Sequence, residues 1–141
     1  MIIFLDCDGV INRKSDWSRS GVINTECVNV LVDLCHAVNA NIVLSSTWRA
    51  GYAQDGNHSP QVKKLENILK KEKIKIVGIT PITESKSRDE EISYYCRRNS
   101  VSEFIILDDD ESLFKQKGNL YIVNPETGLT KNDYKKIAKR R

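Results

Sequence analysis

The sequence lacks the features that mark membrane and secreted proteins. No stretch of it approaches the about 18 consecutive apolar residues that a membrane-spanning helix needs. The apolar run at the N-terminus is short, ends at Asp6 and has no basic start, unlike the core of a signal peptide. We therefore expect a cytoplasmic location and no membrane partner.

Cysteine is present, but in no pattern that indicates a metal site. The four cysteines are Cys7, Cys27, Cys35 and Cys96, and no two of them have Cys-x-x-Cys spacing. The last three fall on the apolar faces of expected helices. We interpret them as small buried hydrophobic residues of a protein in a reducing compartment.

Repeats, low-complexity linkers and a strong excess of one charge are also absent. The chain has 141 residues, 40% of them hydrophobic and 29% charged, which is typical of a globular protein. This length predicts a single domain over residues 1–141. The net charge of +3 permits an anionic substrate but does not require nucleic acid.

Short apolar runs alternate with helical patterns along the chain, an order typical of a parallel α/β sheet. The strongest strand candidates are residues 2–5, 42–44 and 104–107, and the weaker ones are 74–79 and 120–123. Helix start signals lie at Asn24 or Thr25, at Ser59-Pro60, at Ser87 and at Thr130. The predicted fold is a three-layer, Rossmann-like α/β domain with a mostly parallel five-stranded sheet flanked by helices.

Polar side chains follow the three strongest strand candidates. In such sheets, ligands bind at the carboxyl ends of the strands, so these side chains should converge. They are Asp6 and Asp8, then Ser45 and Ser46, then Asp108, Asp109 and Asp110.

Several carboxylates at one sheet edge would repel one another strongly unless a divalent cation lay among them. Mg²⁺ suits such an oxygen-rich site and often bridges to a substrate phosphate. Asp6 is then a candidate nucleophile that attacks phosphorus. Asp8 is a candidate general acid and base.

Two other metal-binding motifs do not fit this segment. An EF-hand loop needs a third ligand where Val10 stands, and no P-loop motif occurs anywhere in the chain. A purely structural interpretation treats Asp6 and Asp8 as turn residues before Gly9. The aspartates that independently follow another buried run, beginning at Asp108, favour the catalytic interpretation.

These motifs, in this order, resemble those of the haloacid dehalogenase (HAD) superfamily of phosphohydrolases. The first motif, D-x-D-x-[TV], reads Asp6-Cys7-Asp8-Gly9-Val10. The second, a Ser or Thr that ends a strand, is Ser45, and the fourth, a pair of aspartates, is Asp108-Asp109. An aspartate at position 8 favours phosphoryl transfer over the dehalogenase branch of this superfamily.

The resemblance implies a role for each matching position. Asp6 would be the nucleophile and a metal ligand, and Asp8 the acid and base, with its backbone carbonyl on the metal. Ser45, with Ser46 and Cys7 beside it, would bind phosphate, and Asp108 and Asp109 would complete the Mg²⁺ site. The basic residue of the third motif is either Lys86 or Arg88, and the expected helix start favours Arg88.

The sequence leaves no room for the cap domain that many members carry after the first motif or after the third strand. An open site admits a large substrate such as a nucleic-acid end or a phosphoprotein. The segment Ser45-Ser46-Thr47-Trp48-Arg49 resembles the small phosphatase domains of RNA-repair proteins and of polynucleotide kinase–phosphatases.

Two arginines are candidates for contacts with such a substrate. Arg49 would hold a second phosphate or a polynucleotide strand. Arg13 lies in residues 12–23, hereafter the 12–23 loop, where Trp17 is a candidate for stacking on a base. The other interpretation of this loop is a solvated segment with one packed tryptophan.

Three functions follow from these features. The first is a magnesium-dependent phosphomonoester hydrolase that forms an aspartyl-phosphate and acts on nucleotides or polynucleotide ends. The second is a phosphatase for a small metabolite. The third is a noncatalytic module that binds phosphate or nucleic acid, although binding alone would not need Asp8.

Overall fold

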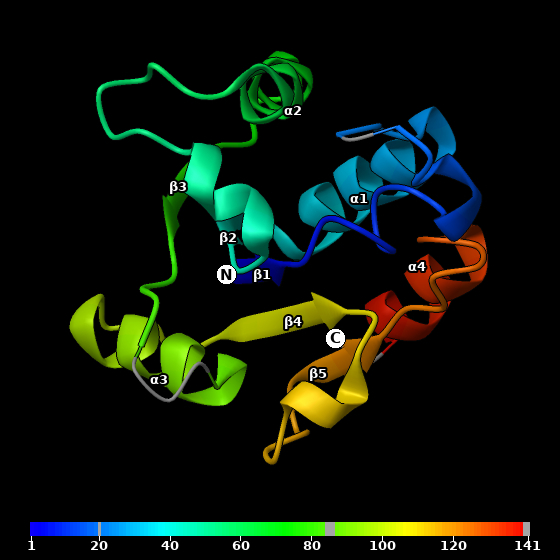
Figure 1. The fold of residues 1–141 in the computed structure, drawn as a ribbon. Helices are drawn as coiled ribbons and strands as arrows, with labels where there is room; N and C mark the ends of the chain where they lie inside the picture. Colours follow the sequence, from blue (N-terminus) through cyan, green and yellow to red (C-terminus); the bar gives the residue numbers. More distant parts are fainter. Residues whose placement is uncertain (20, 84–86, 140–141) are drawn as a thin grey trace.

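The computed structural model describes residues 1–19, 21–83 and 87–139 and shows a parallel sheet between two layers of helices (Figure 1). The sheet has five strands in the order β3-β2-β1-β4-β5, and every neighbouring pair is parallel. The strands are β1 Ile2–Leu5, β2 Asn41–Leu44, β3 Ile76–Ile79, β4 Phe104–Asp108 and β5 Leu120–Ile122. The predicted three-layer α/β fold is confirmed.

The helices begin where the sequence signals predict. They are α1 Thr25–Val38, α2 Pro60–Lys71, α3 Arg88–Arg98 and α4 Lys131–Lys139, with short 3-10 helices η1 Lys14–Asp16, η2 Thr47–Gly51 and η3 Glu111–Leu113. The side chain of Asn24 accepts a hydrogen bond from the backbone N–H of Cys27, which identifies Asn24 as the cap of α1. Thr130 and Asp133 cap the start of α4 reciprocally.

Strand β3 is shorter than predicted, because the backbone of Ile74 is bonded to the C-terminus of α2. The backbone N–H of Ile74 donates to the carbonyl of Leu69, and Lys73 adopts a left-handed φ of 60°. This geometry satisfies a free carbonyl at the helix end. The backbone of Ile74 therefore completes the C-cap of the helix rather than opening the strand, and its side chain is buried.

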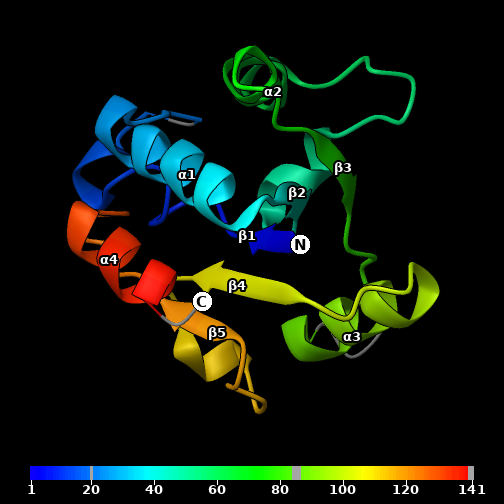
Figure 2. The ribbon, with the colours of Figure 1, turned by 180° about the vertical axis from the view of Figure 1, so that it is seen from behind.

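Alternate residues of the central strands supply two separate apolar cores. Ile3 and Leu5 of β1 face the larger core, which also contains buried residues of α1, α2 and α4. Phe4, between them, faces the smaller core beneath α3 and η3. Figures 1 and 2 show α1 and α4 side by side, with α3 lying away from them. Both faces of the sheet are thus covered, as a parallel sheet requires.

No separate cap domain is present in the described ranges, where only η1 and α1 intervene between β1 and β2. None of the helices in these ranges combines the length and the apolar character needed to cross a membrane.

Candidate active site

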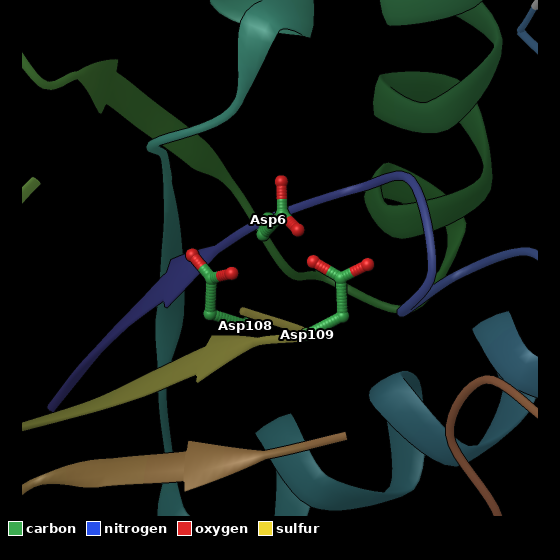
Figure 3. Close-up of side chains that lie close together, drawn as sticks. All are labelled: Asp6, Asp108 and Asp109. Carbon is green, nitrogen blue, oxygen red and sulfur yellow. The ribbon is translucent and has the colours of Figure 1, made fainter. Parts of the chain in front are cut away.

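Three aspartates lie together at the carboxyl ends of two neighbouring strands. Asp6 directly follows β1, Asp108 is the last residue of β4, and Asp109 comes next. Leu5 pairs with Leu107 in parallel register, so the two strands end side by side. One carboxylate oxygen from each aspartate lies within 4.8 Å of the others. Figure 3 shows the three side chains close together.

A glycine lets this group form. Gly9 has φ = +86°, a left-handed conformation that residues with a side chain rarely adopt. A Cβ atom at this position would lie 2.3 Å from Oδ2 of Asp109. The glycine of the first motif therefore provides the space into which the Asp109 carboxylate extends.

Burial makes this group of carboxylates electrostatically unfavourable on its own. Asp6 is 5% exposed and Asp108 is fully buried. Desolvation, followed by the charge of Asp108, raises the pKa of Asp6 to about 9, although Arg88 acts in the opposite direction. Burial also raises the pKa of Asp108. The group thus favours a bound proton or a bound cation.

Arg88 supplies a cation at this site. It is the first residue of α3, and its Nη1 lies 2.5 Å from Oδ2 of Asp108 and 3.3 Å from Oδ1 of Asp6. The other candidate for the third motif, Lys86, falls outside the residues that the structure describes. The structure thus places Arg88 beside the predicted nucleophile, and the choice between Arg88 and Lys86 stays a prediction.

Asp8 lies outside the group of three carboxylates and is held by a different set of side chains. Its Oδ1 accepts hydrogen bonds from Nδ2 of Asn12 at 3.0 Å and from the indole N–H of Trp48 at 3.3 Å. Sequence reasoning missed Asn12, whose only signal is a polar residue directly after the buried Val10-Ile11 pair. The side chain of Trp48 is in the core, yet its N–H reaches Asp8.

The second motif presents an unpartnered hydroxyl to the same sheet edge. Ser45 follows β2, and its Oγ is buried without a hydrogen-bond partner in the described part of the chain. Such a hydroxyl is costly unless a ligand atom completes its bonding. Ser46 instead caps η2 by accepting the backbone N–H of Trp48. The thiol of Cys7 is fully buried in the core, so any phosphate contact by Cys7 must come from its backbone.

Comparison with known proteins decides the family. Residues 2–134 match the family described as the HAD domain in Swiss Army Knife RNA repair proteins. The chain belongs to this family. Searches of curated proteins and of solved structures each found no match. The resemblance inferred from the motifs is confirmed, and membership supports a phosphohydrolase-type function in an RNA repair context.

The residues of this HAD domain fit a divalent cation. Asp6, Asp108 and Asp109 each offer a carboxylate oxygen, the type of ligand that Mg²⁺ and similar hard cations prefer. A cation among them would also offset the burial and the repulsion from Asp108 that raise the pKa of Asp6. Members of the HAD superfamily typically use such a metal, and the donor set here agrees with that use.

The two arginines expected to contact substrate are both engaged within the HAD domain itself. Arg49 bonds through Nη1 to Oγ1 of Thr80 at 2.7 Å and to Oε1 of Glu91 at 2.9 Å. Arg13 pairs with Glu26 at 2.7 Å. Each acidic partner lies on a helix, Glu26 on α1 and Glu91 on α3, and the substrate contacts expected of the two arginines stay a prediction.

Proposed function

We propose that this HAD domain is a magnesium-dependent phosphomonoester hydrolase that removes phosphate from nucleic-acid ends through an aspartyl-phosphate on Asp6. The observation that carries the proposal is the ion pairing of Arg88 with both Asp6 and Asp108, within a group of three carboxylates of which these two are buried. Such a site combines a nucleophile with the positive charge that an approaching phosphate requires.

The metal and Arg88 would have complementary electrostatic roles. Held by Asp6, Asp108 and Asp109, Mg²⁺ would supply Lewis-acid stabilisation of charge on a phosphoryl oxygen. Arg88 carries a permanent positive charge that favours the ionised form of Asp6. Burial and the charge of Asp108 raise the pKa of Asp6 to about 9 even with Arg88 beside it, so this carboxyl needs a further positive charge to be ionised and nucleophilic at neutral pH, and a bound cation would supply it.

The chemistry divides between the two aspartates of the first motif. An oxygen of Asp6 attacks phosphorus, the bond from phosphorus to the leaving oxygen breaks, and Asp8 gives that oxygen a proton. Asp8 then takes a proton from water, which attacks the aspartyl-phosphate, frees inorganic phosphate and regenerates Asp6. The hydroxyl of Ser45 donates a hydrogen bond to a phosphate oxygen and so gains the partner that it otherwise lacks.

The geometry around Asp8 supports its role. The N–H groups of Asn12 and Trp48 both donate to one oxygen of Asp8, which holds the carboxyl group in one orientation. Its other oxygen is then the one available for proton transfer. The RNA repair context of the family and the lack of a cap domain in the described ranges support a polymeric substrate.

Hydrolysis of a simple aryl phosphate with and without Mg²⁺ tests the reaction. Asp6→Asn should reduce turnover to the background rate, and Asp8→Asn should lower it by about 10²- to 10⁴-fold. Asp110→Asn is the matched control, because this exposed aspartate adjoins the site without belonging to its carboxylate group. Turnover that survives Asp6→Asn would exclude Asp6 as the nucleophile.

Substrate choice needs a separate comparison. An oligonucleotide with a terminal phosphate should be hydrolysed with a higher kcat/KM than the matching free mononucleotide. Equal values would point to a small-metabolite phosphatase. Binding of the oligonucleotide without turnover of any phosphate would point to a noncatalytic module.

A further inference from the structure

Trp17 is a large exposed aromatic side chain connected to the proposed acid and base. It follows η1 in the 12–23 loop, and 42% of its surface is exposed to solvent. The second tryptophan, Trp48, is only 3% exposed and belongs to the core. Exposing an indole forgoes the stabilisation that its burial would provide, so an exposed indole held in place is a candidate for ligand contact.

One buried side chain joins Trp17 to Asp8. The indole N–H of Trp17 donates to Oδ1 of Asn12 at 2.8 Å, and Nδ2 of the same Asn12 donates to Oδ1 of Asp8 at 3.0 Å. Asn12 is 1% exposed. The polar edge of the indole therefore faces inward, and its apolar ring surface is the part left for solvent or a ligand.

The side chain of Asn12 is held in one orientation, because its amide uses all of its hydrogen-bonding groups. Its Oδ1 also accepts the backbone N–H of Gly9, and its Nδ2 also donates to the carbonyl of Val22. The backbone N–H of Trp17 donates to the carbonyl of Lys14. Trp17 is thus fixed relative to Asp8 by both its side chain and its backbone.

The charged residues that precede Trp17 are already paired. Arg13 binds Glu26 at 2.7 Å, and Lys14 lies 3.7 Å from Glu126. Among the described residues of the 12–23 loop up to Trp17, the feature left to contact a ligand is therefore an aromatic surface rather than an unpaired cation. An aromatic surface recognises the faces of nucleobases and tolerates any base sequence.

We infer that Trp17 forms a nucleobase subsite, on which the base of the phosphate-bearing terminal nucleotide stacks. The inference rests on the proposed function, in which Asp8 protonates the leaving oxygen. That oxygen belongs to the sugar of the terminal nucleotide, whose base is therefore close to the site. A base that stacks on Trp17 holds the leaving oxygen near Asp8. The subsite takes nucleotide ends of any sequence and gives no advantage to phosphates without a base.

Two oligonucleotides with a terminal phosphate, identical except that one lacks the base of the terminal nucleotide, test the subsite. Trp17→Ala should lower kcat/KM for the complete oligonucleotide by about five- to a hundredfold, the range expected for one stacked base. Its effect on kcat/KM for the abasic oligonucleotide should be much smaller, so the preference of the enzyme for the complete oligonucleotide should fall. Equal losses on both substrates, or no loss on either, would overturn the inference.

Trp17→Phe separates stacking from support of the loop. Phenylalanine keeps an aromatic face but cannot donate to Asn12. This variant should retain most of the preference for the complete oligonucleotide. If it instead behaves like Trp17→Ala, and both variants impair the abasic substrate equally, Trp17 acts through Asn12 and is a positioning residue.

A binding measurement decides the point without catalysis. Because Trp48 is buried, iodide should quench mainly the fluorescence of Trp17. Adding the complete oligonucleotide to the Asp6→Asn variant should shield Trp17 from iodide, whereas the abasic one should not. Shielding without turnover by the wild type would reject the proposed function and keep the subsite. Turnover without shielding would keep the proposed function and reject the subsite.

Discussion

Gly9 links the backbone of the first motif to the geometry of the carboxylate group. In Gly9→Ala, the added methyl would meet Oδ2 of Asp109 at 2.3 Å, and the φ of +86° would strain any L-residue. We expect a loss of stability of about 2–3 kcal/mol, since strain and steric overlap combine. We also expect weaker Mg²⁺ binding, because Asp109 must move. Urea unfolding and Mg²⁺ titration measure the two effects.

Gly56 provides the matched control. It has the same φ of +86°, but a Cβ atom there would meet no heavy atom within 4 Å. Gly56→Ala should therefore lower the free energy of unfolding only by the cost of the backbone strain, about 1–2 kcal/mol. The Mg²⁺ affinity of this variant should be unchanged. Equal losses in the two variants would show that Asp109 relaxes freely away from position 9.

The buried thiol of Cys35 should make the stability of the protein depend on pH. Burial raises the pKa of this thiol from 9.0 to about 12. Between these values the folded protein keeps the proton while the unfolded chain releases it, so stability is full below pH 9.0 and falls as pH rises through this window. Within this window, a single thiol lowers the free energy of unfolding by about 1.4 kcal/mol for each unit that the pH rises.

The measurement is urea unfolding of the wild type and of Cys35→Ala at pH values below and above 9.0. The substitution itself costs stability at every pH, because it removes buried volume. The stability difference between the two proteins should narrow as the pH rises above 9.0. A constant difference would contradict the prediction.

At the scale of elements, the ion pair between Arg49 and Glu91 joins η2 to α3. The two side chains are 14% and 3% exposed, and Glu91 also accepts the backbone N–H of Thr83. Glu91 lies one turn after Arg88 in α3. The pair thereby connects the segment after Ser45 to the helix that carries Arg88.

Glu91→Gln should destabilise the protein by about 3 kcal/mol, because it leaves a partly buried guanidinium without its counter-charge. We also expect kcat for the aryl phosphate to fall as the start of α3 loosens, with a smaller change in KM. Thermal unfolding and steady-state kinetics measure both effects.

The exposed pair of Arg13 with Glu26 is the matched control. Its side chains are 36% and 82% exposed, so water already screens the interaction. Glu26→Gln should therefore cost less than about 1 kcal/mol and leave kcat unchanged. Similar effects of the two substitutions would mean that the pair between η2 and α3 has no special role.

At the scale of the whole molecule, the carboxylate group exists only when β1 and β4 are paired. Asp6 and Asp108 are far apart in the chain, so the unfolded protein has no comparable site. Mg²⁺ should consequently stabilise the folded state, by about 2.7 kcal/mol at a free concentration one hundred times its Kd. Thermal unfolding with Mg²⁺, and again after chelation, measures the gain and its reversal.

The same experiment on variants locates the site. Asp109→Asn should reduce the increase in Tm, because one of the three carboxylates is lost. Asp110→Asn should not, since the side chain of Asp110 caps η3 and lies outside the group. An equal increase in Tm in all three proteins would place the cation elsewhere.

Much of this architecture was predictable from local patterns. The apolar runs of β1, β2 and β4 and the cap signals at Asn24, Ser59 and Thr130 are short-range features, and the structure confirms the elements that they predict. The residues that follow those strands were predictable as a group, because parallel strands end at one sheet edge. Arg88 was favoured by its place at a helix start.

The sequence by itself determined which elements form and which polar residues end the strands, because periodicity and capping act over a few residues. The tertiary structure alone decided the partners of those residues. Asn12 joins Trp17 to Asp8, and Glu91 pairs with Arg49 across 42 positions of the chain. Such contacts depend on how whole elements pack, and no local pattern in the chain encodes them.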